Sequence, residues 1–120
     1  MKKLLSIFTF ILFSVTLNAT PVDCTVPIAD SEFQAEIKKI QTHDFDEAKK
    51  EATEKLLLGK CFTSAQVKTL LENLSFEEHK LELAKKAYAH VIDKENFGIV
   101  SSIFEFDDAK DELAAFIKKN

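Results

Sequence analysis

The sequence predicts an all-α protein in which three helix-hairpin repeats of about 30 residues pack into one compact bundle or short helical array. Three observations support this prediction. The 120 residues include only two glycines and two prolines, and 46% are apolar, which is typical of helical chains rather than strand-rich ones. Apolar residues recur at the three- and four-residue spacing of amphipathic helices. One short motif also occurs three times, and a chain of this length forms at most one domain.

The repeated motif starts with phenylalanine, continues with two acidic residues, and has lysine at its fifth place and glutamate at its seventh. Its copies begin at Phe45, Phe76 and Phe106, which lie 31 and 30 residues apart. A period of this size indicates stacked supersecondary units. Three such hairpins can together bury one continuous apolar layer.

The first hairpin is expected near residues 31–41 and 45–58. Asp30 or Ser31 is the expected N-cap of its first helix. Asp44 and Glu47 have the spacing of a capping box for the second helix, and Gly59 is expected to end that helix in a left-handed conformation. The apolar stripes of this hairpin are Phe33, Ile37 and Ile40, then Ala48, Ala52, Leu56 and Leu57.

The second hairpin is expected near residues 63–73 and 76–91. Thr63 or Ser64 is the expected N-cap of its first helix, and Ser75 with Glu78 forms a second capping-box pattern. The stripes are Val67, Leu70, Leu71 and Leu74, then Leu83, Ala84, Ala87, Tyr88 and Val91.

The third hairpin is expected near residues 95–104 and 107–118. Asp93 or Asn96 is its expected first N-cap, and Glu105 with Asp108 is a weaker capping pattern. The stripes are Phe97, Val100, Ile103 and Phe104, then Leu113, Phe116 and Ile117. The helical spacing of the phenylalanines predicts that all eight after residue 20 fill the core, and that Phe76→Ala costs about 3–5 kcal/mol. These eight are Phe33, Phe45, Phe62, Phe76, Phe97, Phe104, Phe106 and Phe116.

The first residues have the pattern of an export signal. Two lysines precede an apolar run over 4–17 that is shorter than a membrane span requires. We expect a signal peptide at 1–19 cleaved after Ala19, an extended arm at 20–30 and a single helical domain at 31–120. Lipidation of Cys24 is an open alternative. The predicted location is therefore periplasmic or extracellular, without stable membrane insertion after cleavage.

The chain has two cysteines, Cys24 and Cys61, and an exported protein folds in an oxidising compartment. The two are expected to form a disulfide that closes a loop of about 38 residues and contributes roughly 4 kcal/mol in the chain-entropy model. A redox-active or metal-binding thiol pair is the alternative, but such pairs usually have close C-x-x-C spacing.

Charge argues against nucleic acid as a partner. All 16 basic residues are lysines, and removal of 1–19 leaves 14 of them against 20 acids, a net charge of −6. An acidic chain without arginine repels phosphate-rich partners and anionic lipid.

No catalytic constellation emerges from the sequence. The histidines His43, His79 and His90 are too scattered to indicate a zinc site, and no nucleophile accompanies them. The acidic cluster over residues 107–112 could hold Ca²⁺ weakly, but it lacks the turn glycine of an EF-hand. We therefore expect no enzyme, no metal and no cofactor.

Two kinds of binding surface remain as hypotheses. Lys49, Lys80 and Lys110, with His79, could line an interaction face for an envelope or extracellular protein. Alternatively, a groove lined by Tyr88, Phe97 and Phe104 could bind a small apolar ligand in the cell envelope. The predicted function is an exported, non-catalytic protein-interaction module whose biological role and oligomeric state the residues do not define.

Three segments resemble an exported bacterial family, the domain of unknown function 4476. They are residues 61–67 (CFTSAQV), residues 74–88 (LSFEEHKLELAKKAY) and residues 91–97 (VIDKENF), and residues 103–106 (IFEF) echo the family's ending. The resemblance extends from about Cys24 to Ile117. It departs after Asn96, where the family often has two aromatic residues and this chain has Phe97 followed by Gly98. The resemblance implies a small helical secreted domain and no known activity.

Overall fold

The computed structural model describes residues 23–120, so the expected signal peptide and its cleavage position lie outside the described residues. The described part is helical. Its elements are α1 (Asp30–Gln41), α2 (Asp46–Gly59), α3 (Ser64–Leu71), α4 (Glu77–Ala87), the 3₁₀-helices η1 (Tyr88–His90) and η2 (Lys94–Ile103), and α5 (Asp107–Lys119). The boundaries predicted from periodicity agree with these to within a few residues.

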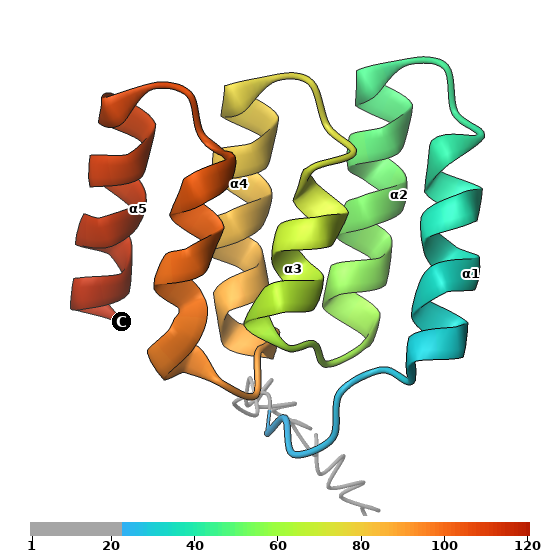
Figure 1. Cartoon of the computed structure of the whole chain (residues 1–120), viewed down its shortest axis with the longest axis horizontal. Helices are drawn as coiled ribbons and strands as arrows, with labels where there is room; N and C mark the ends of the chain where they lie inside the picture. Colours follow the sequence, from blue (N-terminus) through green and yellow to red (C-terminus); the bar gives the residue numbers. More distant parts are fainter. Residues whose placement is uncertain (1–22) are drawn as a thin grey trace, which may run out of the picture.

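Consecutive helices pack as neighbours and form two rows. Figure 1 shows α2, α4 and α5 side by side in chain order, with α3 and η2 side by side in the other row and α1 beside α2. The turns at 42–45, 72–76 and 104–106 all lie at one end of the molecule, which we call the turn end. Short antiparallel connections of this kind keep sequential helices in contact.

The core lies between the two rows. Phe62 and Phe97 are its largest fully buried side chains, and Phe33 meets Phe62 edge to face at 6.4 Å between ring centroids. The other buried apolar residues come from every α-helix, from η2, from the N-terminal arm and from the connections, and they match most of the predicted stripes. They are Ile28, Phe33, Ile37, Ile40, Leu57, Val67, Leu70, Leu71, Leu74, Leu83, Ala84, Ala87, Val91, Val100, Phe104 and Leu113.

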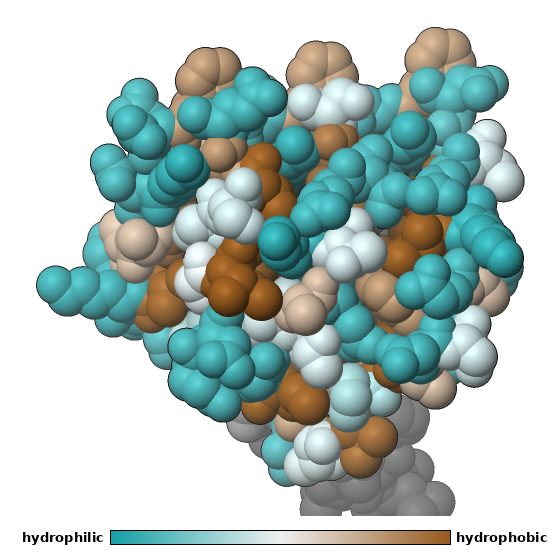
Figure 2. Space-filling model, in the orientation of Figure 1, coloured by the Kyte–Doolittle hydropathy of each residue, from teal (hydrophilic) through white to brown (hydrophobic). Residues whose placement is uncertain are grey.

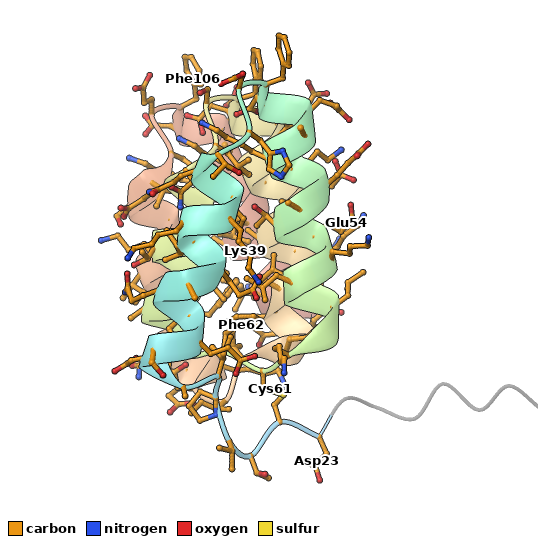
Figure 3. All side chains as sticks on the ribbon, turned by 90° about the vertical axis from the view of Figure 1, so that its right-hand side faces the viewer. Asp23, Lys39, Glu54, Cys61, Phe62 and Phe106 are labelled. Atoms are coloured by element: carbon orange, nitrogen blue, oxygen red, sulfur yellow. A yellow bond between two sulfur atoms is a disulfide. The ribbon has the colours of Figure 1, made fainter. Side chains whose placement is uncertain are left out.

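Three phenylalanines are exposed and a fourth, Phe116, is half-buried against the core, which corrects the prediction that all eight fill it. Phe45, Phe76 and Phe106 keep 77%, 59% and 62% of their surface exposed. Each is the residue immediately before the first turn of its helix, with extended backbone at φ between −106° and −92°. An extended N-cap residue does not direct its side chain along the helix stripe, so helical phase does not apply to it. All three extend from the turn end, where Figure 3 labels Phe106 and Figure 2 shows a row of three apolar groups.

The predicted capping boxes at Asp44, Ser75 and Glu105 are wrong, because phenylalanine occupies the N-cap position in each case. The predicted cap Thr63 is confirmed: its hydroxyl accepts from the Gln66 amide at 3.1 Å, and Gln66 Oε1 accepts from the Thr63 amide. Helix α1 instead begins after Ala29, and α2 ends at Gly59 without a left-handed residue.

The ten-residue η2 is a 3₁₀-helix where the sequence predicts an ordinary helix. Its inward residues Phe97, Val100 and Ile103 are three apart, and residues at that spacing line up on one face of a 3₁₀-helix. Helix α1, in contrast, spaces Phe33, Ile37 and Ile40 by four and three, which suits 3.6 residues per turn.

Backbone bonds and a disulfide close the end opposite the turns. Cys24 and Cys61 are bonded, with 5.6 Å between their Cα atoms, and the Ile28 amide donates to the Cys61 carbonyl at 2.8 Å. Phe62 then forms an isolated bridge with Val91, the Phe62 amide donating to His90 and its carbonyl accepting from Ile92. The N-terminal arm is thereby fixed against two helix connections.

Removal of the disulfide should destabilise the fold through the unfolded state. We expect Cys24→Ser/Cys61→Ser to lower the free energy of unfolding by about 4 kcal/mol, because the bridge restricts a loop with a sequence separation of 37 residues. Urea denaturation of the variant and of the oxidised wild type measures the difference. An unchanged midpoint and slope would contradict it.

Substitution of a buried phenylalanine should lower the free energy of unfolding much more than substitution of an exposed one. Phe97→Ala removes a fully buried ring and should cost about 3–5 kcal/mol, whereas Phe76→Ala should cost less than about 1 kcal/mol. Thermal and chemical denaturation of the matched pair test this. Equal losses in the two variants would show that Phe76 contributes to packing as much as Phe97 does.

Candidate functional site

The most distinctive surface of the described chain is the row formed by Phe45, Phe76 and Phe106, which we call the phenylalanine ridge. Each ring stands at the start of one helix of the α2, α4 and α5 row, so the spacing of the ridge follows the packing of those helices. On the face seen in Figure 2, polar groups lie below and between the three apolar ones. Exposed aromatic rings aligned in this way are typical of contact surfaces.

Carboxylates that follow the ridge residues hold neighbouring turns together. Asp46 Oδ1 accepts from the Ser75 amide at 2.6 Å, across 29 residues of sequence. Glu77 Oε1 accepts in the same way from the amides of Glu105 and Phe106, the latter at 3.1 Å. We call these two carboxylates the turn clamps, because each one binds the turn of the next helix pair and fixes where the next ridge phenylalanine stands.

The first clamp is paired at both of its oxygens. Its second oxygen, Asp46 Oδ2, lies 2.6 Å from His79 Nδ1, and the other ring nitrogen of His79 lies 3.5 Å from Glu47 Oε2. Burial opposes ionisation of Asp46, but hydrogen bonds from the Ser75 amide, the His79 ring and the Phe76 amide outweigh it, and the pKa of Asp46 falls below 3.8. Asp46 is therefore a stable anion.

The second clamp has an unpaired oxygen. Glu77 Oε2 is buried and has no hydrogen-bond partner among residues 23–120. The residue that corresponds to His79, three places after its phenylalanine, is Ala109, whose methyl group donates no hydrogen bond. A buried acceptor without a donor is unfavourable by about 1–3 kcal/mol.

A groove lies beside this second clamp. Its volume is about 370 Å³, and Phe76 and Phe106 both line it. The remaining lining residues are Ser75, Glu77, Glu78, Lys80 and Glu105, so three acidic residues and one lysine line the groove. The groove therefore combines aromatic walls with net negative charge.

Acidic residues also surround the rest of the ridge. The exposed members are Asp44, Glu47, Glu78, Glu105, Asp107 and Asp108. Several of them lie in the first turns of α2, α4 and α5, where a negative charge complements the helix dipole. The ridge is thus apolar along its line and acidic on its flanks.

The lysines of the predicted interaction face lie just behind the ridge. Lys49, Lys80 and Lys110 are each half-buried, and each backbone amide donates to the carbonyl of the phenylalanine one turn earlier. His79 packs edge to face on Phe76, with 5.4 Å between ring centroids, and bonds Asp46. The structure therefore brings the four residues to the turn end, with the phenylalanines more exposed than the lysines.

The residues of the predicted apolar groove lie in the core and at its edge. Phe97 and Phe104 are buried, and Tyr88 is half-buried. Tyr88 meets Phe97 at 5.2 Å and Phe116 at 5.9 Å between centroids, in edge-to-face geometry. Tyr88 thus packs on Phe97 and Phe116, and Phe104 is part of the same hydrophobic core.

Neither a metal-binding cluster nor a membrane-spanning helix occurs over residues 23–120. Over residues 23–120, no cluster of three or more His, Cys, Asp or Glu side chains is arranged to hold a metal ion. Within that same range, no helix combines the length and the apolar character needed to cross a membrane.

Sequence reasoning missed the ridge and the turn clamps. The phenylalanines have the same phase as the buried stripes, so periodicity assigns them to the core. The available signal was their position, directly before two acidic residues at the start of a helix in all three copies of the motif.

A comparison with family models matches residues 27–117 to the Domain of unknown function (DUF4476). Comparison with curated proteins and with solved structures gives no significant match. The match covers both turn clamps, the ridge and Cys61.

Neutralising the first clamp should change stability in a pH-dependent way. Because the pKa of Asp46 is lower in the folded protein than its ordinary 3.8, its charge stabilises the fold above about pH 4, and this contribution disappears as the pH falls through the folded pKa. We expect Asp46→Asn to cost about 1–2 kcal/mol at pH 7 and progressively less below pH 4.

Denaturation curves between pH 2 and pH 7 measure this difference. Asp44→Asn, a change at an exposed carboxylate of the same turn, is the matched control and should have little effect. A constant deficit for Asp46→Asn at every pH would contradict the electrostatic role.

Proposed function

Since this chain belongs to the DUF4476 family, whose description gives no activity, we propose its role from the structure: an exported, non-catalytic module that binds another protein through the phenylalanine ridge. The observation that carries the proposal is the exposure of three phenylalanines at equivalent places of the three motif copies. Large aromatic side chains are the residues that most often dominate binding energy at protein interfaces.

The exposure of the ridge phenylalanines is better explained by binding to a partner than by a role in folding. Core packing does not require the three rings, since fully buried residues such as Phe62, Phe97 and Leu113 already fill the space between the rows. Exposing a large apolar ring has no folding benefit, and covering it with a partner recovers about 25 cal/mol per Å² of apolar surface. The turn clamps hold the backbone of the turns that carry Phe76 and Phe106, which lowers the entropic cost of binding.

We infer that the helix pairs α1–α2, α3–α4 and η2–α5 are three copies of one hairpin unit. The motif recurs at 31 and 30 residues, and the turn clamps join the first unit to the second and the second to the third in the same manner. Stacked helical units commonly offer an extended edge to a partner.

The compartment is part of the proposal. The signal-like start of the sequence and the Cys24–Cys61 disulfide support export, and the partner is then an envelope or extracellular protein. Binding of a small apolar ligand gains no support from Tyr88, Phe97 and Phe104, because their rings pack against core neighbours.

Replacement of the whole ridge should abolish partner binding and preserve the fold. We expect Phe45→Ser/Phe76→Ser/Phe106→Ser to weaken binding at least about 100-fold, since each buried aromatic anchor contributes on the order of 2 kcal/mol. Tagged protein is used to capture envelope and medium proteins, native mass spectrometry identifies the partner, and calorimetry measures its affinity.

The matched control is Leu58→Ser/Ile99→Ser, which removes exposed apolar residues outside the ridge. It should bind as the wild type does. Loss of the partner in the control, or its retention by the ridge variant, would refute the assignment of the binding surface.

A further inference from the structure

We propose that the groove between Phe76 and Phe106 binds a basic side chain, lysine or arginine, of the partner protein. This inference rests on the proposed protein-binding function and adds the chemistry of the partner. It follows from a difference between two otherwise equivalent places in the structure, the junction of α2 with α4 and the junction of α4 with α5.

Both junctions use the same bond. Asp46 follows Phe45 and holds the turn before α4, and Glu77 follows Phe76 and holds the turn before α5. In each case one carboxylate oxygen accepts from turn amides 28 or 29 residues further along the chain. The remaining oxygens, Asp46 Oδ2 and Glu77 Oε2, therefore occupy equivalent places and can be compared directly.

The second oxygens differ in what they bind. At the first junction a nitrogen donor, His79 Nδ1, lies 2.6 Å from Asp46 Oδ2, and the same ring contacts Phe76 edge to face. At the second junction Ala109 takes the corresponding place, and Glu77 Oε2 is left without a donor from the described chain. The first junction thus shows which chemistry the second can accept: a nitrogen donor, able to carry positive charge, next to an aromatic ring.

The surroundings of the second junction favour a cation from outside. Phe76 and Phe106 both line the groove, and a cation over an aromatic face is attracted by its quadrupole. Glu78 and Glu105 are exposed at the groove, and Lys80 is the one basic side chain that lines it. A long basic side chain can place its methylene stem between the rings and its charged end among the carboxylates.

Glu77 Oε2 is buried in the free protein. A docked cation therefore first meets the exposed carboxylates, and it bonds Oε2 only once the side chains that cover this atom move aside. The bond would satisfy an acceptor that the free protein leaves unpaired, and this makes the groove selective for a donor over an apolar side chain of the same length.

The test follows the backbone amides of Glu105 and Phe106, which donate to Glu77. Purified protein is titrated with N-acetyl-arginine amide and N-acetyl-lysine amide, and with N-acetyl-norleucine amide as the uncharged probe, while amide resonances are followed by NMR. The inference expects saturable shifts at Glu105 and Phe106 with the basic probes and at least fivefold weaker binding of norleucine. Equal binding of all three probes, or no saturable shift at these amides, overturns it.

Two variants change the site in opposite ways. Glu77→Gln keeps the size and the carbonyl oxygen but removes the charge, and Ala109→His supplies the donor that His79 provides at the first junction. Both should weaken the basic probes at least fivefold. Ala109→His should also raise the melting temperature by roughly 2–5 °C, because it pairs the free oxygen.

The matched control is Ala48→His, which adds the same ring at the equivalent place of α2, where no turn clamp precedes it. It should leave probe binding and melting temperature unchanged. If Ala48→His weakens the basic probes as much as Ala109→His does, the effect is general electrostatics and the inference is overturned.

Failure of this inference is separable from failure of the proposed function. Should Glu77→Gln and Ala109→His bind the captured partner like the wild type while the ridge variant does not, the ridge binds the partner without a basic side chain in the groove. Should the ridge variant retain the partner, the proposed function itself fails.

Discussion

The bond from a carboxylate to the next turn is the constraint on which the turn end depends. A side chain at the N-cap position usually provides a hydrogen-bond acceptor for its own helix, but a phenylalanine there provides none. Asp46 and Glu77, from the preceding helix pair, instead accept from amides just before these helices, those of Ser75, Glu105 and Phe106. These bonds hold neighbouring helix pairs in register at the turn end.

The two ends of the molecule are closed by different means. At the end away from the turns, main-chain bonds through Cys61 and Phe62 and the disulfide join the arm to two connections. Asp93 adds a side-chain link there, accepting from the amide and hydroxyl of Ser64 at 2.7 and 2.9 Å. Along the row of α2, α4 and α5, Lys50 pairs with Glu82 and Lys85 with Glu112, both at 2.7 Å. Ion pairs at the surface contribute little to the free energy of unfolding.

Much of the architecture could be predicted from local pattern. The helices, the recurrence of the motif and the pairing of two cysteines depend on spacing and composition, and these are visible in the sequence. The ridge could not be found in this way, because Phe45, Phe76 and Phe106 share the phase of the buried stripes and only the position of the first helical turn separates them. The turn clamps and the unpaired Glu77 oxygen depend on contacts between residues about 30 apart, which local capping rules do not consider. The 3₁₀ form of η2 follows from a strict spacing of three that is easily taken for part of an ordinary helical stripe.

The disulfide-bonded arm also determines how the phenylalanine ridge is oriented relative to any group joined to the chain. Asp23 and Cys61 lie at the end opposite Phe106, and α5 runs from the turn end back to the C-terminus on that same far side (Figures 1 and 3). The thirteen residues of α5 place about 20 Å of helix between its start, beside the ridge, and its end. A fusion partner, a solid support or a neighbouring domain joined next to Asp23 or at the C-terminus would therefore meet the end away from the three phenylalanines, and either attachment would leave them sterically accessible.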